Sequence, residues 1–165
     1  MSTELQEYFK HHGIVHQTTC PYTLQQNGVA ERKNRHLLEV VHASLLGANA
    51  LMSYWGEAIS STIYLINRVP STFLVFQTSF DVLTKAVEAP IVPNLPPRVF
   101  GCVVFVHLPK EQRNKLESRA LKCIFVGYSS SHKGYRCYHP TTKNIYMTMN
   151  VMFHEENMYF RQIEL

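Results

Sequence analysis

The spacing of apolar residues changes once along the chain, just after its middle. In the first half, apolar residues recur every three or four positions, which is the period of an α-helix with one buried face. Polar turns separate the periodic segments, with Gly13, Pro21 and the pair Asn27-Gly28 as turn signals. The pattern predicts helices over 6–13, 29–46, 53–68 and 77–87, and a short strand over 14–19.

Two of these helices carry a clear apolar stripe. The stripes consist of Ala30, Leu37, Val41 and Leu45 in 29–46, and of Trp55, Ile59, Ile63 and Ile66 in 53–68. Glu31 falls about 90° from the centre of the first stripe, so its side chain is expected at the edge of the buried face. Pro70 should end the second helix, and Thr78 or Ser79 should cap the helix over 77–87.

In the second half the period becomes two, which is typical of strands. Strand-like runs occupy 99–107, 122–128, 134–139 and 144–153, and the polar stretches "SSSHKG" and "HPTTKN" supply tight connections. Four or five short antiparallel strands in so few residues favour a small barrel or rolled sheet.

A proline-rich stretch marks the expected boundary between the two halves. The segment "EAPIVPNLPP", 88–97, holds four prolines in ten residues and cannot form regular structure. The predicted organisation is therefore a helical part over 1–87, a linker over 88–97, a β module over 98–156 and a tail over 157–165.

Charge is also distributed unevenly along the chain. Residues 98–154 hold nine Lys and Arg against two Glu, a net charge of +7, whereas 1–97 have a net charge of −1. A basic, aromatic-rich module favours a polyanionic partner, although an ordinary basic surface is the competing interpretation. Tyr135 and Tyr138 could stack on exposed nucleotides, but a structural role is expected to be the commoner one. The predicted nucleic-acid contacts in this module are Arg113, Lys115, Arg119, Lys122, Lys133 and Arg136, with Lys143 beside them.

Several other classes of protein receive no support. No apolar run is long enough to span a bilayer and no signal core opens the chain, so an intracellular protein without a membrane partner is expected. The four cysteines are widely spaced and are interpreted as reduced, mostly buried thiols. His12 and His16 could share a helix face, but Gly13 between them argues against a metal site there.

Glu31 can be interpreted in two ways from its spacing. A glutamate in the first turn of a helix interacts favourably with the helix dipole and can pair with a base four residues on, here Arg35. A carboxylate that leads into Arg32, Lys33 and Arg35 also suits a catalytic acid placed beside a polyanion. Spacing alone favours the ordinary helix interpretation.

A family resemblance changes that balance. The segments "GIVHQTTCPYTLQQNGVAERKNRHLLE", "YWGEAISSTIYLINRVPS", "PRVFGCVVFVHLP", "KLESRALKCIFVGYSSSHKGYRCYHP" and "NVMFHEE" closely resemble the integrase encoded in the Pol polyprotein of copia-type LTR retrotransposons. The resemblance covers nearly the whole chain. It implies an α/β fold class, with the C-terminal helices of an RNase H-like catalytic core in 1–87 followed by a small Src-homology-3-like barrel.

The resemblance also implies roles for the residues near Glu31. In such integrases two aspartates and a glutamate hold two Mg²⁺ or Mn²⁺ ions, and Glu31 matches that glutamate as catalytic residue and metal ligand. Two metals activate the attacking oxygen and stabilise the leaving one in phosphodiester transfer. Arg32, Lys33 and Arg35 would bind DNA beside it. The implied partners are retroelement ends, target DNA and other integrase protomers, and the implied location is nuclear.

The match departs from the family at its catalytic acids. The family's two aspartates lie further upstream of the glutamate than the 30 residues that precede Glu31, and Asp81 lies in the wrong segment. The chain alone is therefore expected to be an inactive integrase fragment that holds no metal. The alternative is a non-enzymatic DNA-binding or assembly module that survives from a decayed mobile element.

Overall fold

A computed structural model describes residues 3–16, 28–86, 94–108, 119–130 and 132–162 of the 165-residue chain. It divides into two compact units, 1–36 and 37–165, which are described separately below. Among the described residues, no helix is long and apolar enough to cross a membrane.

The first unit contains helix α1, Thr3–His11, and the first turns of α2, Gly28–Ala48. Gly13 follows α1 with a φ of 65°, and the amide of Ile14 donates to the carbonyl of Phe9 at 2.8 Å. Glycine adopts this left-handed conformation without steric cost, so it ends the helix as expected. The strand expected over 14–19 does not form at 14–16, and 17–19 lie outside the described residues.

The second unit begins with the rest of α2 and continues through a 3-10 turn and a further helix. A 3-10 turn, η2, spans Met52–Tyr54, and helix α3 spans Trp55–Ile66 and ends ahead of Pro70 as expected. The buried face of α3 consists of Ala58, Ser61 and Thr62, and Ile63 on the expected apolar stripe is 44% exposed. The predicted helix is confirmed. Trp55 and Ile59 of the expected stripe pack half-buried against the core, but the fully buried residues are small ones that let α3 lie close to its neighbour.

A small hairpin and a helix follow α3. Strands β1, Pro70–Ser71, and β2, Gln77–Thr78, pair antiparallel around the 3-10 turn η3, Thr72–Leu74. Helix α4 spans Ser79–Ala86, and the hydroxyl of Thr78 accepts from the amide of Asp81 at 3.0 Å. The carboxylate of Asp81 accepts from the same hydroxyl at 2.6 Å, which confirms Thr78 as the helix cap.

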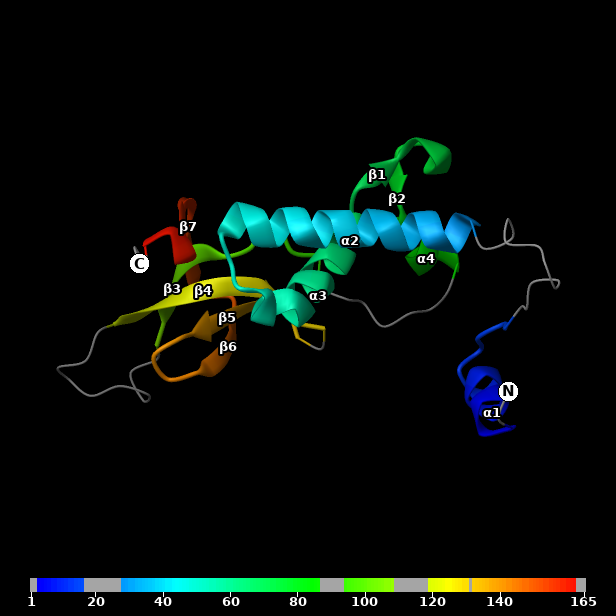
Figure 1. The fold of residues 1–165 in the computed structure, drawn as a ribbon, viewed down its shortest axis with the longest axis horizontal. Helices are drawn as coiled ribbons and strands as arrows, with labels where there is room; N and C mark the ends of the chain where they lie inside the picture. The colour runs from blue at the N-terminus through cyan, green and yellow to red at the C-terminus, as the bar shows by residue number, and fades with distance from the viewer. Residues whose placement is uncertain (1–2, 17–27, 87–93, 109–118, 131, 163–165) are drawn as a thin grey trace. The chain divides into compact units, whose positions relative to one another are not determined.

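Five antiparallel strands form the main sheet of the second unit, in the order β6-β5-β4-β3-β7 (Figure 1). Their bounds are Cys102–His107 for β3, Ala120–Tyr128 for β4, Tyr135–His139 for β5, Asn144–Thr148 for β6 and Val151–Met158 for β7, with a 3-10 turn, η5, over Phe160–Gln162. The run predicted over 144–153 is two strands, because the chain turns at Met149 and Asn150 and returns to pair with β3.

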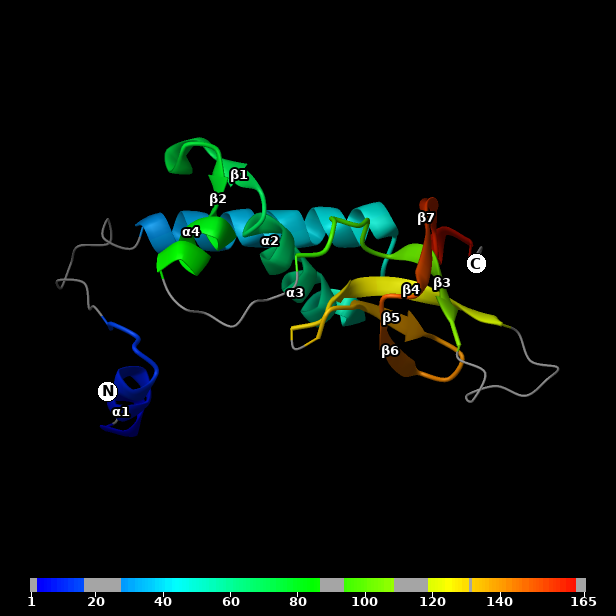
Figure 2. The ribbon, with the colours of Figure 1, turned by 180° about the vertical axis from the view of Figure 1, so that it is seen from behind.

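Both faces of this sheet are covered, and β4 is buried between two cores. On one face Phe125 packs with the residues of a barrel core, Cys102, Val104, Val106, Cys123, Tyr128, Tyr135 and Cys137. On the other face Ile124 and Val126 pack against Val41, Leu45, Ala48 and Ala58 of the helices and against Phe100. Helix α3 runs beside the sheet in both views (Figures 1 and 2). The predicted helical part followed by a β module is thus confirmed.

The described end of the proline-rich stretch is bound to α3 and to the sheet. Leu95 is buried, its amide donates to the hydroxyl of Tyr64 at 2.7 Å, and that hydroxyl donates to its carbonyl at 3.2 Å. The ring of Tyr64 stacks on Tyr128 with centroids 3.8 Å apart. Because 87–93 lie outside the described residues, the linker expected over 88–97 and the four-part division stay predictions.

Candidate nucleic-acid interface

Glu31 lies in the first turn of α2, where the helix dipole favours a carboxylate. Its side chain is exposed, as are those of the residues from Val29 to His36 around it. The expectation that it lies at the edge of a buried face is therefore wrong, because the buried residues of α2 begin only at Val41. An exposed carboxylate can be reached by a ligand.

The basic residues beside Glu31 do not neutralise it. The Nε of Arg32 donates to the carbonyl of Gly28 at 3.1 Å, which turns this guanidinium back along its own helix. Lys33 and Arg35 are exposed. In the described part of the chain, the ion pair that forms joins Arg98 to Glu155. The pairing of Glu31 with Arg35 is not observed there.

Glu31 does not meet other metal ligands in the described part of the chain. No group of three or more His, Cys, Asp or Glu side chains is close enough there to hold a metal ion. A two-metal site needs several carboxylates around both ions. The described residues therefore do not fit the metal pair that the family resemblance implies.

In the second unit, the strand register places Lys122 and Lys143 at one end of the β4–β5–β6 part of the sheet. Ile124 pairs with Tyr138, and His139 pairs with Asn144. Lys122 and Lys143 therefore lie at the same position along the strand direction. Both side chains are exposed, and the Nζ of Lys122 lies 5.5 Å from the ring centroid of Tyr159. The exposed Arg119 precedes β4 at this end, so the described bases here form a first basic group, Arg119, Lys122 and Lys143.

A second basic group, Lys133 and Arg136, lies at the opposite end of β5. Lys133 is exposed in the turn before this strand, and Arg136 is half-buried across from Gly127 and Met147. β5 has five residues and so separates the two groups by roughly 17 Å. Arg113 and Lys115 lie outside the described residues, so their predicted roles stay predictions.

Two other arginines are held by the fold. The guanidinium of Arg98 pairs with Glu155 at 2.7 Å and lies 4.4 Å from the ring centroid of Phe153. The hydrogen bond to Glu155 raises the pKa of Arg98, so it stays charged and paired. Arg68 lies over the rings of Tyr64 and Phe80 at 3.5 and 4.4 Å. Both arginines are therefore engaged by contacts within the fold.

The aromatic residues near these bases support the fold. Tyr135 is 4% exposed inside the barrel core, where its ring meets Phe153 edge-on at 4.8 Å. Tyr138 is half-buried and meets Tyr54 at 5.8 Å. The structural role is therefore confirmed for Tyr135, and no nucleobase can stack on it without opening the core. Sequence reasoning missed Tyr159 beside Lys122, whose contact has no signal in sequence spacing.

Three of the four cysteines are free thiols in the barrel core, and Cys20 lies outside the described residues. Burial raises the pKa of Cys102 to about 12 and that of Cys123 to about 11. Burial also raises the pKa of Cys137, with a smaller contribution from the other two thiols. These cysteines are protonated at neutral pH and unreactive, which confirms the interpretation as buried thiols for these positions.

Comparison with known proteins agrees with this architecture. Residues 102–164 match the family described as the retroviral polymerase SH3-like domain. Over 95% of its length the chain is 43% identical to the Retrovirus-related Pol polyprotein from transposon TNT 1-94 of Nicotiana tabacum, of which it covers 12%. Over 92% of its length it is 37% and 38% identical to the Pol polyproteins from transposons RE1 and RE2 of Arabidopsis thaliana, of which it covers 10% each.

The chain thus spans about a tenth of the length of these curated relatives, and the matched residues contain all five strands of the sheet. The helices that cover the outer face of β4 fall within the longer alignment to the Pol polyproteins. The chain therefore belongs to the Pol polyproteins of copia-type retrotransposons, and it includes their SH3-like domain.

Proposed function

We propose that this chain is part of a retrotransposon integrase and that it binds DNA through the two basic groups of its SH3-like domain. The observation that carries the proposal is the register of β4, β5 and β6. It places Lys122 and Lys143 at one end of β5 and Lys133 at the other, all with exposed side chains. Exposed Lys and Arg side chains bind phosphates and release condensed counterions.

The separation of the two groups suits one duplex. Five base pairs of DNA rise roughly 17 Å, which matches the length of β5. A duplex lying along this strand would present phosphates to Lys143 and Lys133 together. The basic residues of helix α2 are assigned to the DNA backbone and no described helix looks like an element that reads base edges, so binding without sequence preference is expected.

Glu31 has a separate role in the proposal. In the intact enzyme it would be the glutamate ligand of the Mg²⁺ or Mn²⁺ pair, with Arg32, Lys33 and Arg35 beside the DNA backbone. The exposure of Glu31 and its lack of an ion pair among the described residues support this role. One carboxylate cannot hold two metal ions, so the chain by itself is proposed to bind DNA without joining it.

A second function, that of a DNA-binding or assembly module without catalysis, is favoured by one observation. The described residues bring no three metal-binding side chains together. Both functions predict the same DNA affinity for this chain. They differ in whether Glu31 completes an active site when the rest of the polyprotein is present.

Charge removal at the first basic group tests the DNA-binding proposal. In the variant Arg119→Gln with Lys122→Gln, affinity should fall alike for two unrelated duplexes. The slope of log affinity against log salt should flatten by roughly one for each phosphate contact that is lost. Fluorescence anisotropy of the full chain at several salt concentrations measures both quantities.

The matched control removes two exposed lysines elsewhere, Lys10→Gln with Lys85→Gln, and carries the same change in net charge. Its salt slope should stay close to that of the unaltered chain. The proposal fails if binding does not depend on salt, or if the control variant loses as much affinity as the first.

A further inference from the structure

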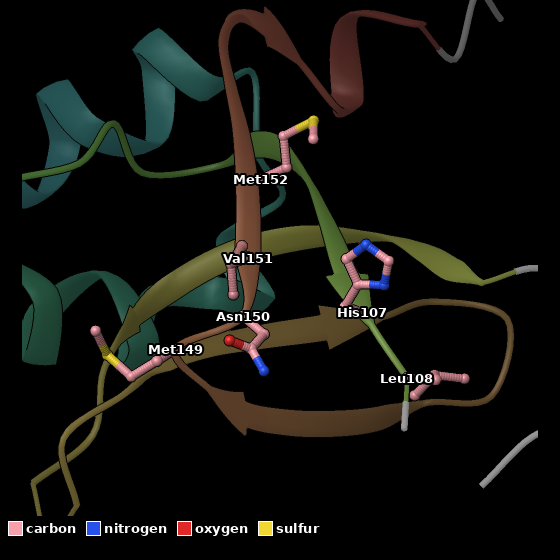
Figure 3. A pocket seen from close by; sticks show the side chains of 6 residues that line it. All are labelled: His107, Leu108, Met149, Asn150, Val151 and Met152. Carbon is pink, nitrogen blue, oxygen red and sulfur yellow. The ribbon is translucent and has the colours of Figure 1, made fainter. Parts of the chain in front are cut away.

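Two hollows of the second unit differ in what they offer a ligand. One has a volume of about 530 Å³ at the end of β3 and the start of β7, and it is lined by His107, Leu108, Met149, Asn150, Val151 and Met152 (Figure 3). These described side chains point in different directions and include no Asp, Glu, Lys or Arg. The other hollow, called the Arg68 pocket below, has a volume of about 260 Å³ and is lined by charged groups as well. It is formed by Arg68 after α3, by Thr78, Phe80 and Asp81 at the start of α4, and by 94–97.

The guanidinium of Arg68 has one nitrogen without an acceptor. Its Cζ lies 3.5 Å from the ring centroid of Tyr64 and 4.4 Å from that of Phe80. Its Nη1 donates to the carbonyl of Tyr64 at 3.1 Å, and its Nε donates to Oδ1 of Asn94 at 3.3 Å. Its Nη2 is buried and has no hydrogen-bond partner among the described residues. A buried donor without an acceptor costs free energy, so a ligand that supplies an acceptor here would recover that cost.

The carboxylate of Asp81 lines the same pocket. Its Oδ2 accepts from the hydroxyl of Thr78 at 2.6 Å and from the amide of Thr78 at 3.4 Å, and these hydrogen bonds lower the pKa of Asp81. The carboxylate is therefore charged at neutral pH. Arg68 and Asp81 form no ion pair with each other in the described part of the chain. A donor and an acceptor of opposite charge thus line one hollow without contacting each other.

The remaining walls of the Arg68 pocket are mainly apolar. They include the ring of Phe80, the buried Leu95 and the prolines Pro96 and Pro97. Such side chains provide surfaces on which a planar group can pack. The volume falls just below the roughly 300 Å³ at which pockets for drug-sized ligands begin, so the pocket suits one ring system rather than a whole nucleotide. A fitting ligand is therefore flat, with an acceptor on one edge and donors on another.

We propose that the Arg68 pocket binds an unpaired guanine base of DNA. O6 and N7 of guanine are the acceptors that arginine contacts most often in specific recognition. On the adjacent edge, N1–H and the N2 amine are two donors for the carboxylate of Asp81. Adenine has an amine where guanine has O6, and cytosine and thymine each offer a carboxylate one donor nitrogen instead of two. Enzymes that bind an extruded base combine the same edge hydrogen bonds with packing on its faces.

This binding rests on the proposed function, because its partner is DNA, and it concerns single strands. In a duplex, O6, N1 and N2 of guanine are paired with cytosine and cannot enter the pocket. Duplex binding through the two basic groups therefore keeps its lack of sequence preference. An unpaired guanine, whose edges and faces are free, meets the requirements of the pocket.

Fluorescence anisotropy of the full chain with short thymine strands tests the proposal. The strands differ at one central position, which holds guanine, adenine, cytosine, thymine or hypoxanthine. Hypoxanthine keeps O6, N7 and N1–H but lacks the N2 amine. The guanine strand should bind roughly tenfold more tightly than the thymine strand, because hydrogen bonds to charged groups are the strong ones. The hypoxanthine strand should lie between the two.

Two variants remove one side of the pocket each. Asp81→Asn keeps an oxygen for the hydrogen bonds from Thr78 but removes the charge, so guanine and hypoxanthine strands should bind alike. Arg68→Lys keeps a positive charge but removes Nη2, and it should lower the preference for guanine over thymine to roughly twofold or less. The matched control, Glu156→Gln, removes an exposed carboxylate elsewhere and should leave the preference unchanged. Thermal melting monitored by circular dichroism verifies that each variant is folded.

The ratio of affinities separates base recognition from DNA binding as such. Arg119→Gln with Lys122→Gln should weaken binding to every strand and leave the preference for guanine in place. If no strand binds, the proposed DNA binding fails and base recognition fails with it. If all strands bind equally, only base recognition is overturned. It is also overturned if another base is preferred, or if either Asp81→Asn or Arg68→Lys keeps the full preference for guanine.

Discussion

At the scale of single residues, Gly101 decides how closely α2 can lie against the sheet. It has a φ of 78°, and a Cβ at this position would overlap the Cβ of Ala48. Ala48 is 1% exposed, so neither side has room to move. A side chain here meets both a disfavoured backbone conformation and a steric clash.

We therefore expect Gly101→Ala to lower the free energy of unfolding by roughly 2–4 kcal/mol. Gly47, one residue before Ala48 in α2, is the matched control, since a Cβ there meets nothing within 4 Å. Gly47→Ala should raise the free energy of unfolding by roughly 0.5–1 kcal/mol. Urea titration of both variants measures these changes, and equal effects of the same sign would contradict the clash.

The buried thiols predict a loss of stability at alkaline pH. The pKa of Cys123 rises from 9.0 to about 11 on folding, and that of Cys102 from 9.0 to about 12. Below pH 9 both the folded and the unfolded chain keep these protons. Above it the unfolded chain binds fewer protons, so the free energy of unfolding falls as pH rises toward the folded pKa. Tyr128 adds to this loss, because burial raises its pKa from 10.0 to about 12.

Cys123→Ala should recover on the order of 2 kcal/mol of the stability lost between pH 8 and pH 11. The measurement is the free energy of unfolding by urea at both pH values, with a reductant present. The comparison uses the difference between the two pH values, which removes the cost of the smaller side chain. An unchanged difference would show that folding does not change the pKa of Cys123.

At the scale of elements, sequence periodicity predicted which segments are helices and strands better than which faces they bury. The strands near 102–107, 122–128 and 135–139 and the helix ending before Pro70 are confirmed. The stripe expected on α3 is confirmed in part, since Trp55 and Ile59 pack against the core, but sequence reasoning gave no weight to the small residues that are fully buried. Ala58 and Ser61 are buried because α3 lies close to β4. That close approach depends on the residues of β4, not on the pattern within α3.

The sequence did contain a signal for that partner. In β4 every residue from Cys123 to Tyr128 is buried, with no polar alternation, as "CIFVGY" shows. A continuous apolar run indicates a strand covered on both faces. Gly127 within it lies against α3, since a Cβ there would be 3.5 Å from the Cβ of Ser61. This pattern could have predicted that helices cover the outer face of the sheet.

The candidate DNA-binding residues could be named from sequence but not arranged. Charge counts singled out Lys122, Lys133 and Arg136, and only the strand register separates them into two groups. The same counts gave no reason to set Arg98 apart, because its partner Glu155 is far away along the chain. Long-range pairing of this kind has no local sequence signature, and the metal-binding role of Glu31 stays a prediction.

At the scale of the whole molecule, the second unit unites elements from both sides of the proline-rich stretch. Tyr64 of α3 stacks on Tyr128 of β4 and its hydroxyl binds both backbone groups of Leu95. Tyr128 in turn accepts a hydrogen bond from the amide of Arg98 at 2.8 Å. These contacts make the helices and the SH3-like sheet one packing unit over 37–165.

A cut within the proline-rich stretch should therefore leave the two pieces associated. With a specific protease site placed in 88–93, cleavage of the full chain should give fragments that elute together in size-exclusion chromatography. The reason is the apolar core shared by Val41, Leu45 and Ala58 with Ile124 and Val126, which buries side chains from both pieces. The fragments should separate only in denaturant.

A variant that damages this shared core provides the control. Ala58→Asp places a charge against the buried face of β4, so its fragments should separate in native buffer. If the fragments of the unaltered chain separate there too, the β module over 98–156 folds independently, as the proline content of the linker suggests. Co-elution of the unaltered fragments and separation of the variant would instead mean that α3 stabilises the SH3-like sheet by covering its outer face. The helices would then belong to the same folding unit as the sheet.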